Sequence, residues 1–284
     1  MFWLVVASLV WAFSFGLIKR FLPGLDPWWV AAARLGLAAL AFGPWLVRAR
    51  FPAAVAGRAL ALGGLQFGLM YVCYLAAYRD LAAWQVALWT VLTPLLVVLC
   101  DQARRRRWRW RAWMAALFAV AAAMLAQGRL PVGDALRGVL LVQASNLAFA
   151  LGQLAYGPLA RRAQVVAGGP GREAGLLGWM YVGGVSLAVG GALLVGGPLA
   201  LDDLAVASPI LLYLGLVPTA LGFWAWNRGA ARVAPGSLAA ANNLKIPLAV
   251  LVSWTVFGEA AAYGRALGGL AMVVAVLFWL DRTG

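Results

Sequence analysis

The stretch GSLAAANNLKIPLAVLVSW, residues 236–254, is apolar along most of its 19 residues but has Asn242, Asn243 and Lys245 near its middle. An α-helix needs about 20 residues to cross a bilayer. A charged side chain at the centre of such a helix costs about 2.5–3.5 kcal/mol on insertion scales, and it usually faces a bundle interior or a water-filled cavity. The stretch therefore predicts a membrane helix whose central polar residues have a functional role.

The rest of the chain repeats this pattern of apolar segments about one membrane span long. Of its 284 residues, 64% are apolar, and its mean hydropathy is +0.87. Soluble domains average roughly 45–50% apolar. The sequence predicts an all-α polytopic membrane protein with ten transmembrane helices and no attached soluble domain. These helices are expected near residues 3–20, 28–48, 58–78, 83–101, 112–127, 136–158, 174–195, 208–227, 236–256 and 264–281.

The net charge of +14 and the basic run at residues 104–111 raise the question of a nucleic-acid partner. Membrane topology explains the charge better. With the N-terminus inside, 15 basic residues fall in even-numbered links or at the C-terminus and 6 in odd-numbered links, although Lys19 and Arg20 belong to the smaller group. This bias follows the positive-inside rule. It predicts both termini on the cytoplasmic side and no nucleic-acid partner.

The two halves of the chain resemble each other weakly. With a shift of 153 residues, residues 77–94 align with residues 230–247 without a gap. We therefore predict a first five-helix repeat at 1–130 and a second at 131–284. Because five is odd, the second repeat starts on the opposite side of the membrane and the repeats are inverted. Secondary transporters often have this plan, with a substrate site near the midplane.

Several segments carry a family resemblance: VWAFSFGLIKR in the first helix, Arg34 in the second, the turn ending at LTP, and LKIPLAVLVSWTVFGE followed by GGLAMVV. With the five-plus-five plan, the chain resembles the EamA family of the drug/metabolite transporter superfamily. It is most similar to bacterial aromatic amino acid exporters of the YddG type. The resemblance implies a monomeric, multi-pass exporter of apolar amino acids in the bacterial inner membrane, working by alternating access. Export of cationic drugs or of another small metabolite is the alternative.

Lys245 is the first candidate for a residue of the substrate pathway. It lies nine residues after Gly236, roughly 13 Å along a helix axis, which is near the midplane. Asn242, Ala249 and Ser253 share its helix face. We expect Lys245 to face a substrate carboxylate or to act as a gating charge. A structural role, with backbone carbonyls holding the lysine near Pro247, is the alternative.

The repeat extends the set of candidates to other helices. The shift of 153 pairs Asn242 with Trp89 and Lys245 with Leu92, which predicts an aromatic side of the cavity opposite a polar, cationic one. Tyr71, Tyr74 and Tyr78 share one helix face, although Tyr78 also suits a membrane-interface position. The remaining predicted cavity residues are Gln85, Trp224, Asn227, Asn146 and Trp11, with Pro94 and Pro247 as matched hinges. Phe149 shares a helix face with Asn146, and Ser14 and Phe15 lie near Trp11 on the first predicted helix.

Arg34 is the second basic residue within a predicted helix. We expect a structural role for it, in contact with Asp26 or with backbone carbonyls. The alternative is that it tunes the access of anions to the pathway.

The residue types that are missing limit the function further. The sequence has no histidine, and its nine acidic residues all fall in links or at helix ends. It therefore predicts no metal, no cofactor and no enzyme site, since a nucleophile–base pair or metal cluster at membrane depth is absent. Proton relays in membranes usually use Asp, Glu or His. Transport is thus expected either to run down a gradient or to couple through Lys245.

Overall fold

The structure, a computed structural model, is helical, and no strand occurs in the part of the chain that it describes. Seven helical spans there are long and apolar enough to cross a membrane. The predicted helices near 112–127, 236–256 and 264–281 lie wholly or partly outside that part, so the count of ten stays a prediction. The described residues are 2–106, 110, 113–114, 117–118, 121, 133–166, 171–230, 245–246, 248–258, 264, 267–268, 271–272 and 275, without the side chains of Pro94 and Ala230.

Four of the seven spans come from the first half of the chain. They are α1 (Phe2–Phe21), α2 (Pro27–Arg48), a span made of α3 (Ala53–Gly63), η1 (Gly64–Leu69) and α4 (Met70–Ala77), and a span made of α5 (Ala83–Trp89), η2 (Thr90–Leu92) and α6 (Thr93–Arg105). Asp26 begins α2, because its carboxylate accepts a hydrogen bond from the Trp28 backbone N–H at 2.9 Å and Pro27 occupies the first turn.

The other three spans come from the second half. They are α8 (Asp134–Val166), α9 (Arg172–Val195), and a span made of α11 (Ser208–Leu214), η3 (Gly215–Leu221) and α12 (Gly222–Ala230), which follows the short helix α10 (Leu201–Val206). Residues 245–246 and 248–255 are also helical.

Two spans contain a π-helical segment at corresponding places. These are η1, which starts at Gly64, and η3, which starts at Gly215. In η3 the cause is Pro218, which has no N–H to donate to the carbonyl four residues earlier. That carbonyl, of Leu214, instead accepts a hydrogen bond from the Thr219 hydroxyl at 2.7 Å. Pro218 therefore widens the helix and fixes the direction of the Thr219 hydroxyl.

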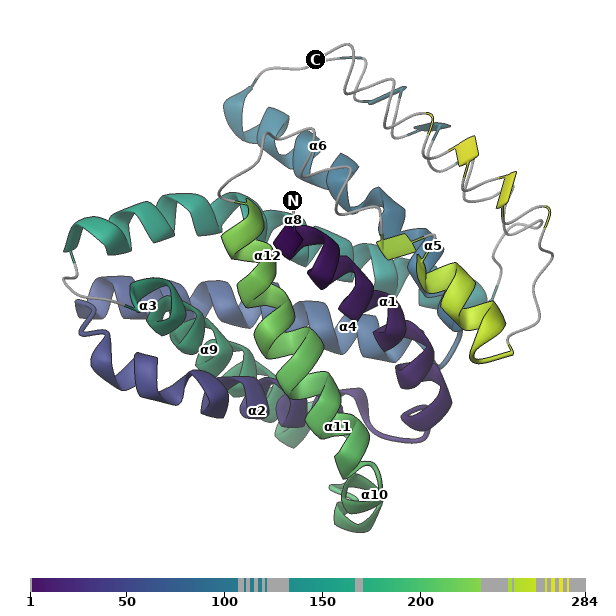
Figure 1. Cartoon of the computed structure of the whole chain (residues 1–284), viewed down its shortest axis with the longest axis horizontal. Helices are drawn as coiled ribbons and strands as arrows, with labels where there is room; N and C mark the ends of the chain where they lie inside the picture. Colours follow the sequence, from purple (N-terminus) through teal and green to yellow (C-terminus); the bar gives the residue numbers. More distant parts are fainter. Residues whose placement is uncertain are drawn as a thin grey trace.

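Glycines allow the spans to approach closely. Helix α9 packs against both α2 and α3 (Figure 1). A Cβ on Gly63 would overlap the Met180 carbonyl, and a Cβ on Gly183 would overlap the Leu60 carbonyl. Because backbone cannot move aside as a side chain can, these two positions of α3 and α9 require glycine. Small residues at such crossings are typical of membrane helix pairs.

A valine at this crossing tests the packing directly. We expect Gly183→Val to destabilise the protein by at least about 1–3 kcal/mol, since it forces extra atoms into a close-packed contact. Gly190→Val is the matched control on the same helix, because a Cβ there meets nothing within 4 Å. The measurement is the thermal unfolding midpoint of both purified variants in detergent. Equal midpoints for the two variants would show that the α3–α9 contact is absent.

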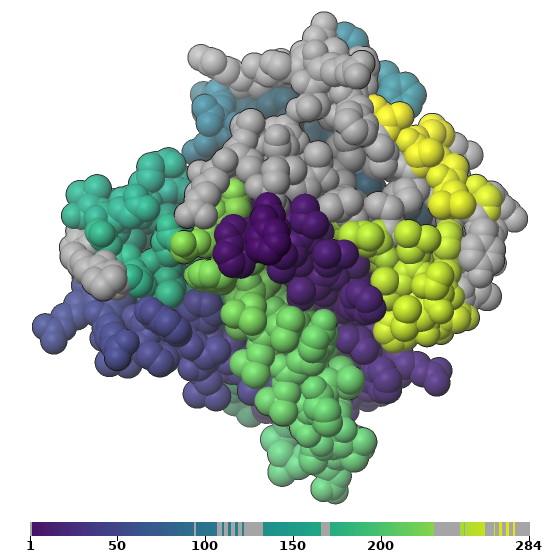
Figure 2. Space-filling model, viewed as in Figure 1, coloured from purple at the N-terminus to yellow at the C-terminus, as the bar shows by residue number. Residues whose placement is uncertain are grey.

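Helix α1 lies between two segments from the second half of the chain. Figure 2 shows α1 in purple, with α11–α12 in green on one side and residues of the 245–257 region in yellow-green on the other. The Lys245 Nζ lies 5.2 Å from the centroid of the Trp11 ring. A Cβ on Gly16 would overlap the Phe257 ring, so α1 also needs a glycine at this contact.

Polar contacts join four links at one end of the bundle. Asp26, before α2, accepts a hydrogen bond from the Gly197 backbone N–H at 3.1 Å and lies 3.9 Å from the Arg79 guanidinium. Asp80 accepts a hydrogen bond from the Nε of Arg137 at 2.9 Å, which ties the link after α4 to the start of α8. Four of the predicted odd-numbered links, the first, third, fifth and seventh, therefore lie at the same end of the bundle.

Candidate functional site

A central cavity is lined by residues of α1, α2, α4, α8 and α12, the η2–α6 region and Lys245. Aromatic rings, hydroxyls, an amide and two cationic groups surround it, and no acidic residue is among its described lining residues. The lining consists of Trp11, Ser14, Phe15, Arg34, Met70, Tyr71, Tyr74, Thr90, Thr93, Ser145, Asn146, Phe149, Phe223 and Lys245. Of the predicted cavity residues, the structure brings Trp11, Tyr71, Tyr74, Asn146 and Lys245 together here.

Arg34 lines the cavity rather than pairing with Asp26, which corrects our expectation. Its side chain is 1% exposed, and its guanidinium carbon lies 4.4 Å above the centroid of the Tyr71 ring. Its Nη2 donates to the Thr219 hydroxyl at 3.1 Å and to the Tyr71 hydroxyl at 3.4 Å. Asp26 instead caps α2 near the end of the bundle and contacts Gly197 and Arg79. The cavity thus contains a second cation.

Lys245 is the other cationic residue that lines the cavity. It is half-buried, and its ammonium lies over the Trp11 ring, a favourable place for a cation. On the same helix, Ala249 and Ser253 are fully buried. The face that these residues share is therefore directed into the bundle. Asn242 and Pro247 lie outside the described residues.

An aromatic cluster forms the apolar part of the lining. Phe223 lies at its centre and is 4% exposed. Its ring centroid lies 5.2 Å from that of Trp11, 6.1 Å from that of Phe149 and 6.4 Å from that of Tyr71. The rings are tilted or edge-on to one another, as aromatic pairs prefer. The cluster therefore offers a solute a rigid apolar surface.

The three tyrosines of α4 and its end occupy two different sites. Tyr71 and Tyr74 line the cavity, whereas Tyr78 does not. The Tyr78 hydroxyl donates to the Tyr74 hydroxyl at 2.6 Å, and the Tyr78 backbone carbonyl accepts a hydrogen bond from the Lys19 ammonium at 2.7 Å. Tyr78 is 1% exposed, so it is not an exposed interface residue.

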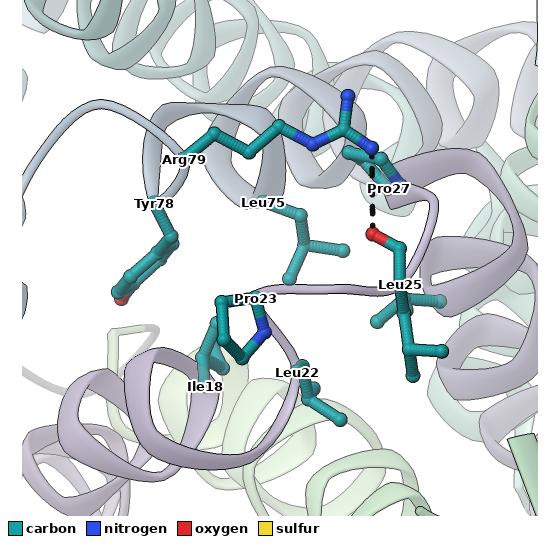
Figure 3. Close-up of a pocket in the computed structure, with 9 residues that line it drawn as sticks. Ile18, Leu22, Pro23, Leu25, Pro27, Leu75, Tyr78 and Arg79 are labelled. Carbon is teal, nitrogen blue, oxygen red and sulfur yellow. Dashed lines mark hydrogen bonds between the residues drawn. The ribbon is translucent and has the colours of Figure 1, made fainter. Parts of the chain in front are cut away.

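Tyr78 lines a smaller pocket near the end of the bundle (Figure 3). This pocket lies between the end of α1, the link to α2 and the end of α4, and apolar side chains such as Ile18, Leu22 and Leu75 surround it. The Arg79 side chain extends across it and donates to the Leu25 carbonyl at 3.5 Å (Figure 3). Arg79 therefore connects the end of α4 to the α1–α2 link. The pocket's apolar lining suits packing better than the binding of a charged solute.

Asn146 joins α8 to the fourth span. Its Nδ2 donates to the Trp89 carbonyl at 3.0 Å and to Gln143 Oε1 at 3.2 Å, and its Oδ1 accepts a hydrogen bond from the Thr93 hydroxyl at 2.9 Å. The Thr90 hydroxyl donates to the Ala87 carbonyl at 2.7 Å. Asn146 and the two threonines are thus already engaged in helix contacts.

Besides Tyr78, the structure places four predicted cavity residues elsewhere. Gln85 turns back to accept a hydrogen bond from the Ala82 N–H at 2.9 Å, so it caps α5. Trp89 does not line the cavity, and its backbone carbonyl accepts a hydrogen bond from Asn146. The Trp224 ring packs edge-on to Trp3 at 5.3 Å and under the Arg228 guanidinium. Asn227, one turn further along α12, is half-buried but does not line the cavity.

The spacing of the cavity residues differs by one from the predicted shift of 153. The lining pairs Tyr71 with Phe223 and Thr93 with Lys245 are each separated by 152 residues, not 153. One residue turns a helix by about 100°, because a turn has 3.6 residues. The shift of 153 therefore selected Trp224 instead of Phe223, and Leu92 instead of Thr93. The offset of 152 would have found Thr90, Thr93 and Phe223.

The comparisons with known proteins identify the family. Residues 1–127 match the model of the EamA-like transporter family. A protein of Pseudomonas aeruginosa named "Probable biotin transporter" is 38% identical over 99% of this chain and 97% of its own length. The chain belongs to the EamA-like transporter family. The transporter is also 32% identical to a "Biotin transporter" of Salmonella typhimurium and 31% identical to one of Escherichia coli, each over 98% of this chain and 92% of the relative.

A solved structure supports the fold independently. It matches the transporter with a TM-score of 0.70 at 19% identity, over 100% of this chain and 98% of the other. The family match and the curated relatives confirm the recognition of the EamA family and of the drug/metabolite transporter superfamily, and the protein is a multi-pass membrane transporter. The closer resemblance to aromatic amino acid exporters is not supported, because the relatives above are named as transporters of biotin.

Proposed function

We propose that the transporter carries biotin, or a monocarboxylate built like it, through the central cavity. The observation that supports this best is the charge of the cavity: Arg34 and Lys245 line it, and no carboxylate is among its described lining residues. The names of the relatives point to the same solute.

The chemistry of biotin matches the three kinds of surface in the cavity. Biotin has a carboxylate, a chain of four methylene groups and a bicyclic ring with a polar ureido group. The cations suit the carboxylate, the rings around Phe223 suit the chain and the bicycle, and the Ser145 hydroxyl suits the ureido group. Binding sites for small molecules commonly combine an apolar lining with few polar groups.

Amino acids and cationic drugs fit this cavity less well. An amino acid brings an ammonium group next to Arg34 and Lys245, and like charges at short range repel. No acidic residue among the described lining residues offsets that repulsion. A hydrophobic cation meets the same obstacle without having a carboxylate of its own. We therefore place export of amino acids, our sequence-based prediction, behind transport of a monocarboxylate.

Transport requires the cavity to change size. It encloses about 90 Å³, whereas pockets that bury drug-sized ligands measure roughly 300–1,000 Å³. We propose that the two halves move apart around the site, in the alternating-access mechanism of inverted-repeat transporters. Pro94, within α6, and Pro247 remain the proposed hinges. The π-helical segments η1 and η3 are further points of irregular helix.

The membrane arrangement completes the proposal. We propose ten helices in two inverted repeats, 1–130 and 131–284, with both termini cytoplasmic, acting as a monomer without a cofactor in the bacterial inner membrane. The 15-to-6 distribution of basic residues supports the orientation. The contacts that join Asp26, Asp80, Arg137 and Gly197 support an arrangement with the odd links on one side. The matched positions of η1 and η3 support the repeat.

Counterflow of radiolabelled biotin into proteoliposomes tests the substrate. We expect vesicles loaded with unlabelled biotin to accumulate the label, and external biotin to compete for the carrier at least about tenfold more strongly than phenylalanine or tetraphenylphosphonium, because of the repulsion described above. Vesicles without protein are the control. Label exchange that phenylalanine inhibits as well as biotin does would reject biotin as the preferred solute.

A further inference from the structure

Arg34 has hydrogen-bond donors that no group in the described part of the chain satisfies. Its Nε and Nη1 are buried without a partner, although its Nη2 has two. Other buried polar atoms lack partners as well, among them those of Gln66, Trp179, Trp226 and Ser253, but none of these residues lines the central cavity. Arg34 therefore combines buried, unpaired donors with a position on the cavity.

The charge of Arg34 also has no counter-ion among the described residues. In the part of the chain that the structure describes, the carboxylates that form ion pairs are those of Asp26, with Arg79, of Asp80, with Arg137, and of Asp101, with Arg104 and Arg105. An arginine keeps its charge in proteins, so burial does not remove the cost by deprotonation. Leaving a buried charge unpaired is unfavourable. A ligand that carries an anion offsets this cost, whereas a neutral ligand does not.

The surroundings of Arg34 hold the guanidinium in place before a ligand arrives. The Thr219 hydroxyl donates to the Leu214 carbonyl, so its oxygen is left to accept hydrogen bonds from Arg34 at 3.1 Å and from the Tyr71 hydroxyl at 3.0 Å. The Tyr181 hydroxyl donates to the Thr219 carbonyl at 2.9 Å. The π-helical segment η3, which Pro218 imposes, thus orients the Nη2 edge of the guanidinium. The Nε and Nη1 donors are left without a partner in the described part of the chain.

We propose that Arg34 is the residue that binds the substrate carboxylate, and that Thr219 positions it. The planar guanidinium can make two parallel hydrogen bonds to a carboxylate, a geometry that a lysine ammonium cannot reproduce. Lys245, over the Trp11 ring, adds positive potential from the other side of the cavity without being the direct carboxylate contact. This inference rests on the proposed monocarboxylate function, and it assigns that function's specificity to a residue of α2.

The test compares biotin with biotinamide, which has the same ring and chain but no charge. Fluxes of both radiolabelled solutes are measured by counterflow in proteoliposomes with equal amounts of monodisperse protein. We expect Arg34→Gln to lower the ratio of biotin to biotinamide flux at least about tenfold, because hydrogen bonds to charged groups are the strong ones. Arg34→Lys should restore part of the ratio, since it keeps the charge without the fork. Arg48→Gln, at the exposed end of the same helix, should leave the ratio unchanged.

Two results would overturn the assignment. One is that Arg34→Gln carries both solutes at the wild-type rate. The other is an equal fall of both fluxes, which would give Arg34 a structural role. If Arg34→Gln does not yield monodisperse protein, Thr219→Val takes its place: it removes the hydroxyl that holds Nη2, and we expect the ratio to fall several-fold. An unchanged ratio in that variant would also overturn the assignment.

A failure of the proposed substrate can be told apart from a failure of this inference. If the wild type carries no biotin, the proposed function fails, and the same variants are measured with a panel of aliphatic and aryl monocarboxylates and their amides. A wild-type preference for an acid over its amide that Arg34→Gln removes would support Arg34 as the carboxylate-binding residue. A wild type that carries none of these acids, or does not prefer them, would overturn it.

Discussion

Lys245→Ala is expected to lower the counterflow of biotin at least about tenfold while the protein stays folded. The ammonium lies on the cavity over the Trp11 ring, and a positive charge in a site of low dielectric attracts an anion far more than it would in water. Removing a charge from membrane depth also lowers an insertion cost of about 2.5–3.5 kcal/mol, so the fold should not suffer.

The control for this variant is Lys19→Ala, which removes the chain's only other lysine. Lys19 donates to the Tyr78 carbonyl away from the central cavity. Both variants are reconstituted in equal amounts and assayed side by side. Biotin flux through Lys245→Ala at the level of Lys19→Ala would make Lys245 a structural residue. Lys245→Ala should change the preference for biotin over biotinamide less than Arg34→Gln does.

Phe223→Ala is expected to have the largest effect on stability. The Phe223 ring lies within 6.4 Å, centroid to centroid, of Trp11, Phe67, Tyr71 and Phe149. Replacing a buried phenylalanine by alanine costs about 3–5 kcal/mol, through lost contacts and the space left behind. The unfolding midpoint in detergent measures this loss. The same change removes the centre of the aromatic cluster, so bulky monocarboxylates should lose their advantage over short ones.

The matched control is Phe13→Ala on α1, where the side chain is 42% exposed. It removes the same atoms from a position outside the aromatic cluster, and we expect a small change in stability and no change in the ranking of solutes. If Phe223→Ala were as stable as Phe13→Ala and kept the wild-type ranking, the aromatic cluster would not form the apolar part of the site.

The sequence predicts the helices well because their signal is strong and local. Blocks of about 20 apolar residues between polar links lead directly to the seven spans of the described part of the chain. Single polar residues inside such blocks, such as Lys245 and Asn146, are costly enough to indicate an interior face. Tyr71 and Tyr74 were found by their spacing on one helix face.

The sequence predicts contacts between helices less well, because they depend on rotation. The shift of 153 selected Trp224 and Leu92, whereas the cavity is lined by their chain neighbours Phe223 and Thr93. Gln85 was assigned to the cavity, but its side-chain oxygen accepts a hydrogen bond from the Ala82 N–H at the start of its own helix. Local capping competes with long-range contacts in a way that helical spacing does not reveal.

Arg34 shows a further limit. Its position in the sequence, eight residues after Asp26, made a partner at the same end of α2 plausible. The actual partners, Tyr71 and Thr219, come from α4 and from η3 in the other half of the chain. Only the packing of these helices shows that Arg34 faces the cavity with unpaired donors.

A structure of the full-length transporter with bound biotin tests the central claim most directly. The account predicts biotin in the central cavity, with its bicyclic ring against Phe223 and Trp11 and its carboxylate within hydrogen-bond distance of the Arg34 guanidinium. Biotin bound only elsewhere, for example in the apolar pocket beside Tyr78, or bound in the cavity with its carboxylate directed away from Arg34, would contradict it.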